Sequence, residues 1–159
     1  MMSELLRSGD LEKHIKEVLN PAYRRRYGIM MAAIERELVP LGVRIGEVKV
    51  QENGNGEDVF GGYFLWLELP EGVSAEVVAD RAKREEELIV APGYIFEVEG
   101  DDRVEFPGSL RLCFSWVEEE DLKIGVERLA RVVRTLRDGI ELQAKCKGFG
   151  KDGDMGEFR

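Results

Sequence analysis

Residues 61–69 (GGYFLWLEL) are apolar at nearly every position, and this stretch constrains the fold more than any other. A strand with one face in water alternates apolar and polar side chains, whereas a continuous apolar run needs cover on both faces or a central place in a sheet. The run is also far shorter than the roughly 20 residues that cross a bilayer. We therefore expect a central strand here and no transmembrane helix.

A second strand is predicted at residues 109–115 (SLRLCFS), where the side chains alternate strictly. One face carries the apolar side chains, Leu110, Leu112 and Phe114. The opposite face carries Arg111, Cys113 and Ser115. Further strands are expected at residues 43–50, 88–90 and 94–98, with a turn at residues 91–93 (APG) between the last two.

Apolar side chains at three- and four-residue spacing predict helices between these strands. The pattern covers residues 11–38 and is interrupted at Asn20-Pro21, so we expect two helices that meet at residue 20, with Asn20 as a cap. Ser74 can cap a third helix that runs to Glu86, with an inner face of Val77, Val78 and Ala82. A last helix is predicted over residues 118–137.

This order of elements predicts an α+β fold, a small and mostly antiparallel sheet covered by helices. The chain has 159 residues, of which 43% are hydrophobic and 35% charged, so one core is expected and two independent domains are not. We expect a single domain over residues 1–141. The glycine-rich polar residues 142–159 are expected to form a disordered tail.

The charge balance excludes some classes of partner. The chain has 32 acidic and 23 basic side chains, a net charge of −9, so its surface repels nucleic-acid phosphates and anionic lipids. We expect no nucleic-acid or membrane partner. The N-terminal residues carry no signal-peptide pattern, so a cytoplasmic location is expected. Cys113 and Cys146 have neither the spacing nor the context of a disulfide or metal pair.

Most charged and polar motifs have a structural interpretation. His14 has no cysteine or histidine nearby and is predicted to be a surface residue, so no metal site is expected. Residues 118–121 (EEED) open a predicted helix, where the helix dipole favours acids. Arg111 differs, because a lone guanidinium in the middle of a strand is costly unless it meets an anion or a wet cleft. It forms either a structural salt bridge or a fork for the carboxylate of a ligand.

Five blocks in the same order together resemble one protein family. They are YRRRY at residues 23–27, preceded by His14-Ile15, then GGYFLWLELP at 61–70, VAPGYIF at 90–96, LRLCFS at 110–115 and GVERL at 125–129. The succession resembles the C-terminal small domain of class I/II aminotransferases, which are pyridoxal-phosphate enzymes of the aspartate aminotransferase fold type. The resemblance implies the α+β fold of that domain, and it implies that Arg111 grips the α-carboxylate of a substrate.

The resemblance also implies what this chain does not supply alone. In the family, the large domain contributes the Schiff-base lysine and the other cofactor-binding groups. None of the lysines of this chain stands in the family's serine-rich context for that residue. We therefore expect no pyridoxal phosphate on this chain alone and no autonomous transamination. Its catalytic residues remain unassigned.

Three functional interpretations stay open. The first is a truncated aminotransferase-like protein that keeps carboxylate binding at Arg111 and forms a homo-oligomer, or has a partner that covers an exposed apolar face. The second is a stand-alone, cofactor-independent, biosynthetic enzyme that has repurposed the fold for a small acid or an apolar substrate. In that case Arg111, Tyr94, Cys113 and Ser115 would contact the substrate. The third is a fragment without independent activity.

Overall fold

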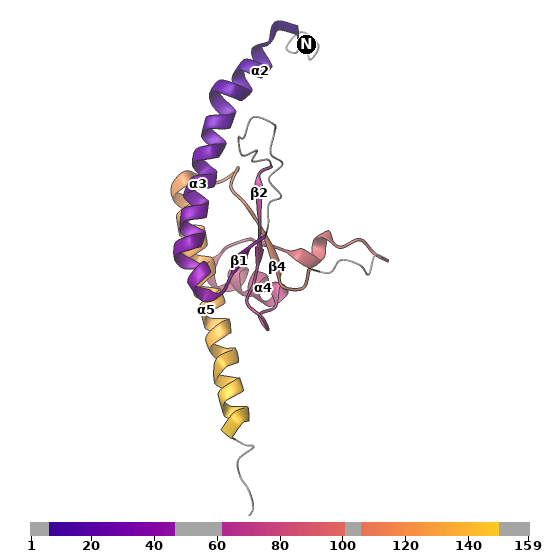
Figure 1. The fold of residues 1–159 in the computed structure, drawn as a ribbon, viewed down its shortest axis with the longest axis vertical. Coiled ribbons are helices and arrows are strands. Elements are labelled where there is room, and N and C mark those ends of the chain that lie inside the picture. Colours follow the sequence, from indigo (N-terminus) through magenta and orange to yellow (C-terminus); the bar gives the residue numbers. More distant parts are fainter. Residues whose placement is uncertain (1–6, 47–61, 101–105, 150–159) are drawn as a thin grey trace, which may run out of the picture.

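A computed structural model of the chain describes residues 7–46, 62–100 and 106–149 (Figure 1). The described part contains a four-stranded sheet in the order β1-β2-β4-β3, in which each neighbouring pair is antiparallel. The strands are β1 (Arg44–Ile45), β2 (Phe64–Glu68), β3 (Ala91–Pro92) and β4 (Ser109–Cys113). The expected α+β fold with an antiparallel sheet is confirmed.

The helices are of very different lengths. A continuous helical rod consists of α2 (Asp10–His14), the π-helical turn η1 (Ile15–Leu19) and α3 (Asn20–Glu37). The other long helices are α4 (Ala75–Glu86) and α5 (Glu119–Phe149). Short 3-10 turns are η2 (Val39–Leu41) and η3 (Gly93–Phe96). No helix within the described ranges is long and apolar enough to cross a membrane.

The strand β2 has the central place that its apolar run predicts, between β1 and β4. Only one of its faces is fully buried, however. Leu65 and Leu67 lie in the core opposite Leu112 and Leu110 of β4, whereas Phe64 on the other face is 47% exposed. Alternation is confirmed over residues 110–115, since Leu110, Leu112 and Phe114 are buried and Arg111, Cys113 and Ser115 are half-buried. Ser109, the first residue of β4, is buried as well.

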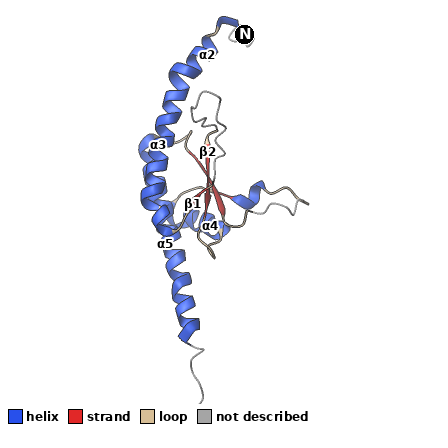
Figure 2. Cartoon of the chain, in the orientation of Figure 1, coloured by secondary structure: helices blue, strands red, loops and turns tan. Residues whose placement is uncertain are grey.

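The helices cover the buried face of the sheet. Figure 2 shows α3 and α5 side by side along one side of it, and they run parallel, since Arg25 pairs with Glu119 and Arg36 with Glu127. The core between helices and sheet consists of aliphatic side chains, among them Ile34 and Leu38, Val78, Leu122, Val126, Leu129 and Val133. The opposite face, which carries Arg111, has no long helix over it in the described part of the chain.

Two helical segments meet at residue 20 as predicted, since η1 ends at Leu19 and α3 begins at Asn20, but the predicted interruption and the cap at Asn20 are wrong. Asn20 has helical dihedral angles, and its N–H donates to the carbonyl of Ile15, five residues earlier. Proline lacks an amide hydrogen and crowds the preceding turn of an α-helix. The wider π turn just before Pro21 accommodates that defect, and the rod continues through it.

The predicted strands and turn at residues 88–98 are also wrong. The expected turn is the edge strand β3, in which Ala91 faces Arg111 and Pro92 faces Leu110. Proline is tolerated there because an edge strand leaves amide positions without a ladder partner. Residues 94–96 belong to the 3-10 turn η3 instead of a strand.

The remaining helix and strand boundaries differ less from the predicted ones. Ser74 caps α4 as predicted, accepting from the Val77 amide, but Val77 is 44% exposed and Ala75 is buried in its place. The helix α5 continues to Phe149, so residues 142–149 of the expected tail are helical. The rest of that tail lies outside the described residues, as do residues 47–50 of the first predicted strand.

Candidate functional site

Arg111 lies between two aromatic rings on the sheet face that has no long helix over it. Its guanidinium carbon is 4.0 Å from the ring centre of Phe64 on β2 and 4.2 Å from that of Phe96 on η3. A guanidinium is attracted to the electron-rich face of an aromatic ring and loses little hydration there. The two rings therefore hold the half-buried arginine in place, with no acid paired to it among the residues that the structure describes.

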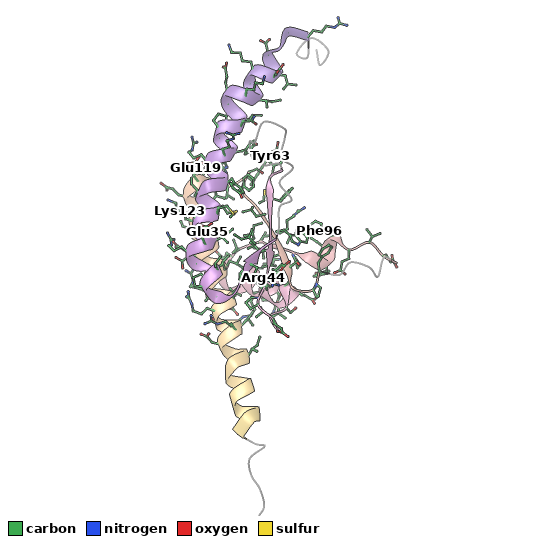
Figure 3. All side chains as sticks on the ribbon, viewed as in Figure 1. Glu35, Arg44, Tyr63, Phe96, Glu119 and Lys123 are labelled. Atoms are coloured by element: carbon green, nitrogen blue, oxygen red, sulfur yellow. The ribbon has the colours of Figure 1, made fainter. Side chains whose placement is uncertain are left out.

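The ring of Phe96 is itself fixed by neighbouring aromatic side chains. Trp66, which faces Arg111 across the β2–β4 ladder, meets Phe96 at 5.6 Å and Phe106 at 5.2 Å between ring centres, both edge to face. Figure 3 shows Phe96 across the sheet from Glu35 and Lys123, which lie on α3 and α5. The η3 turn thus supplies one wall of the arginine site.

The turn η3 reaches this place because Gly93 has no side chain. A β-carbon at position 93 would lie 2.5 Å from the β-carbon and 2.6 Å from the carbonyl oxygen of Phe106. Such distances are too short for any real contact, so the backbone approach requires glycine. Gly93 therefore sets where Phe96 stands relative to Arg111.

No salt bridge is found for Arg111 within the described ranges. The ion pairs and hydrogen bonds among those residues include none from its side chain. Of the two interpretations that its position in the strand left open, the structural salt bridge therefore has no support there. The five N–H groups of the guanidinium are suited to a planar, two-oxygen anion.

A cavity of about 600 Å³ adjoins Arg111 at the C-terminal end of β4. It lies between residues 88–91, the end of β4 and the first turns of α5. Its lining is Met30, Phe64, Leu88, Ile89, Val90, Ala91, Arg111, Leu112, Cys113, Trp116, Val117, Asp121, Leu122, Ile124, Gly125, Val126, Arg128 and Leu129. This volume is in the range of small-molecule sites, which are mostly apolar with a few polar groups.

The structure brings together only part of the predicted site. Arg111 and Cys113 line the cavity, whereas Tyr94 and Ser115 are not among its lining residues. Tyr94 is 48% exposed on η3, and Ser115 is 3.1 Å from Cys113, between Oγ and Sγ. The contribution of residues 88–91 and of α5 was missed, because no local pattern marks a cavity formed by segments far apart in sequence.

The other charged side chains that line the cavity are Arg128 and Asp121. Arg128 donates from Nη1 to the carbonyl of Glu86 at 3.1 Å, and Asp121 belongs to the acidic first turn of α5. Arg131, which is not among the lining residues, donates from Nε to a carboxylate oxygen of the same Glu86 at 2.8 Å. That hydrogen bond lowers the pKa of Glu86 below its ordinary value, against a smaller effect of burial.

Arg26 fastens the turn that follows β4. Its Nε donates to the carbonyl of Phe114 at 2.7 Å, and its Nη2 donates to the carbonyl of Val117. The ring of Tyr27 meets Phe114 edge to face at 5.7 Å, and Arg25 pairs with Glu119 at 2.7 Å. The YRRRY block thus anchors the β4–α5 turn to α3.

The remaining sequence candidates stay at the surface. His14 is exposed on α2, and no group of metal-binding side chains is found among the residues that the structure describes. The acids at 119–121 occupy the first turn of α5, as their helix-dipole interpretation predicts.

Comparison with known proteins shows similarity to aminotransferases over most of this chain. No protein-family model matches the chain. The 2-aminoadipate transaminase of Thermus thermophilus is 33% identical over 136 residues, which are 86% of this chain and 30% of that protein. Aromatic-amino-acid aminotransferase 1 of Thermococcus litoralis is 30% identical over 126 residues, 79% of this chain and 26% of that protein.

Solved structures of aminotransferases are also similar to this chain. The α-aminoadipate aminotransferase of Thermus thermophilus, complexed with N-(5'-phosphopyridoxyl)-L-leucine, superposes with a TM-score of 0.64 and 34% identity, over 84% of this chain and 29% of that one. The kynurenine aminotransferase of Pyrococcus horikoshii gives 0.66 and 28% identity, over 82% and 28%. The chain thus spans about 30% of the length of these relatives, and over about 85% of its own length it is homologous to class I aminotransferases.

Proposed function

We propose that this chain supplies the carboxylate-binding part of an aminotransferase-type protein, with Arg111 as the anion site. The observation that carries the proposal is the environment of Arg111, a guanidinium held between Phe64 and Phe96 with no acid on it among the described residues. In that setting the cation keeps its hydrogen-bond donors for an incoming anion. A carboxylate matches their planar spacing.

The described residues do not fit pyridoxal phosphate. The cofactor needs a lysine at its reacting carbon, and no lysine is found in the cavity lining. Lys16 pairs with Glu12 on α2 at 2.7 Å, and Lys123 is exposed on α5. We therefore assign no cofactor step to this chain, and the proposal limits its own role to holding a carboxylate.

A second chain that covers an exposed face is part of the proposal. Leu11, Ile15 and Val18 on the rod are 37%, 38% and 50% exposed, and the described residues place no other element over them. Exposed apolar side chains in a row favour association. Either a second copy or a partner with the remaining parts of an aminotransferase would cover them.

The stand-alone enzyme remains the weaker candidate. In this interpretation four residues contact the substrate, but only two of them, Arg111 and Cys113, line the cavity. The Sγ of Cys113 is 3.1 Å from the Ser115 hydroxyl, and neither group has a base beside it among the described hydrogen bonds. The observations therefore favour a binding site over an activated nucleophile.

Binding of a minimal carboxylate tests the proposal. We expect propionate to bind saturably in an NMR titration that follows the arginine Nε–Hε signals, and propionamide not to bind. Arg111→Gln removes the cation and should abolish binding, whereas Arg111→Lys keeps the charge without the planar fork and should weaken it by about tenfold.

Arg44→Gln is the matched control. Arg44 is also a strand arginine, but it is exposed and pairs with Glu68 at 2.9 Å across the β1–β2 ladder. Its loss should leave propionate binding unchanged. Unchanged binding in Arg111→Gln would show that the anion site lies elsewhere, and the proposal would then be rejected.

A further inference from the structure

Two exposed apolar side chains stand at the cavity beside Arg111. Trp116 is 89% exposed and Ile89 is 85% exposed, and both belong to the lining. Val117 and Ile124, which also line it, are 41% and 43% exposed. An aromatic and several aliphatic side chains around one opening are typical of a site that covers an apolar group.

The space inside the cavity depends on a glycine of α5. Gly125 lines it, and a β-carbon at this position would meet only the tip of Leu88, at 3.6 Å. Glycine in the interior of a helix is less stabilising than alanine, because its backbone loses more conformational freedom on folding. Here it keeps the wall of α5 flat opposite residues 88–91, so that the cavity is wide enough for a ring or a branched chain.

The charges of the cavity distinguish its two ends. Arg128 is committed to the Glu86 carbonyl at the α4–α5 contact, and Asp121 contributes a negative charge near the start of α5. Arg111 is the cation of the lining for which the described residues provide neither an acid nor a hydrogen-bond acceptor. One end of the cavity thus accepts a carboxylate, and the rest of the lining is apolar apart from Asp121 and Arg128.

We propose that this cavity binds a monocarboxylate with a bulky apolar or aromatic chain. The carboxylate contacts Arg111, and the chain occupies the cleft between residues 88–91 and α5, covered by Trp116. A second carboxylate on the chain would be repelled by Asp121, and Arg128 already donates to the Glu86 carbonyl, so dicarboxylates bind more weakly. This inference rests on the proposed function of Arg111 and adds the class of ligand.

A ligand series on the intact chain tests it by isothermal titration calorimetry. Because a buried phenyl group contributes roughly 1.5–3 kcal/mol, we expect 3-phenylpropionate to bind on the order of 10- to 100-fold more tightly than propionate. Adipate, a dicarboxylate of similar length, should show no such gain. Arg111→Gln should reduce the affinity for 3-phenylpropionate to that of its amide.

Gly125→Leu fills the cleft and is the decisive variant. It should remove the preference for 3-phenylpropionate while propionate still binds at Arg111. Gly139→Leu makes the same change on the same helix, at a site with no atom within 4 Å of the new β-carbon and outside the cavity lining, and it should keep the preference.

The outcomes separate the two proposals. Equal affinities for propionate and 3-phenylpropionate, or a preference that survives Gly125→Leu, would overturn the apolar cleft while leaving the carboxylate site at Arg111 intact. No binding of any carboxylate would reject both. If 3-phenylpropanamide bound as tightly as the acid, or if Gly125→Leu instead dissociated a dimer in sedimentation, the cleft would be an apolar contact surface and the inference would be wrong.

Discussion

The Nε of Arg26 donates a hydrogen bond to the backbone carbonyl of Phe114 at 2.7 Å, although 88 residues separate them. This bond joins α3 to the end of the strand that carries Arg111. The neighbouring Val117 carbonyl accepts from the same guanidinium, so one side chain holds both ends of the β4–α5 turn. The same β4–α5 turn forms one side of the cavity, since Trp116 and Val117 line it.

Arg26→Ala should therefore loosen this turn. Two backbone carbonyls lose a charged donor, and we expect the free energy of unfolding to fall by about 1–3 kcal/mol, measured by urea denaturation. Arg24→Ala, on the exposed side of the same helix, should change it by less than about 0.5 kcal/mol. Equal effects of the two substitutions would contradict the anchoring role of Arg26.

Gly93→Ala tests the close approach of η3 to Phe106. The new methyl group would overlap backbone and side-chain atoms of Phe106, and we expect a loss of about 1–3 kcal/mol in stability. The shift of η3 should also move Phe96 away from Arg111 and weaken propionate binding. Gly108→Ala has no atom within 4 Å of its new methyl group and serves as the control. A fully stable Gly93→Ala chain would rule out the steric argument.

The pair of Glu86 and Arg131 predicts a pH dependence of stability. The hydrogen bond from Arg131 lowers the pKa of the folded Glu86 carboxyl below its ordinary value of 4.5. A carboxyl whose pKa is lower in the folded state stabilises fully above its unfolded pKa, and this stabilisation is lost as the pH falls through the folded pKa. The stability difference between the wild type and Glu86→Gln should thus shrink between about pH 7 and about pH 3.

A double-mutant cycle isolates this pair from other effects of pH. Glu86→Gln, Arg131→Gln and the double variant are compared by urea denaturation at both pH values. The coupling between the two positions should be larger at the higher pH than at the lower one. A coupling of the same size at both would show that the carboxylate form of Glu86 does not matter.

Reaction with pyridoxal phosphate tests the absence of a cofactor lysine in the cavity lining. After incubation, borohydride reduction and intact-mass analysis, peptide mapping should show modification scattered over exposed lysines such as Lys16 and Lys123. A single stoichiometric adduct at one lysine would mean that the chain builds its own cofactor site. In that case the limit that we set on its chemistry would be wrong.

Much of the sheet could be predicted from the sequence because its side-chain patterns are local. Alternation along β4 places Arg111 opposite the buried leucines, and the Ser74 cap fixes the start of α4. The role of residues 91–93 could not be predicted in this way. Pro92 and Gly93 carry turn chemistry, but pairing with Leu110 and contact with Phe106 decide their conformation, and both partners are distant in sequence.

Of the candidate site, only Arg111 could be predicted from local sequence patterns. A lone arginine in an apolar strand signals an unusual residue, and the family resemblance suggests its role. The rings of Phe64 and Phe96 around it have no sequence signal, because they come from different elements. The same holds for the cleft at Gly125, since a glycine within a helical pattern gives no indication of what faces it.

The π-helical turn at Ile15–Leu19 changes which side chains continue the inner edge of the rod. At about 3.6 residues per turn, counting back from the buried Ile34 through Met30, Tyr27 and Tyr23 would reach Lys16 and Glu12. The extra residue of the wide turn shifts this phase by one position, so that Ile15 and Leu11 fall in line instead. One inserted residue thereby replaces charged side chains by apolar ones along this edge of the rod. Deletion of a single residue in this turn would bring Lys16 and Glu12 back to it.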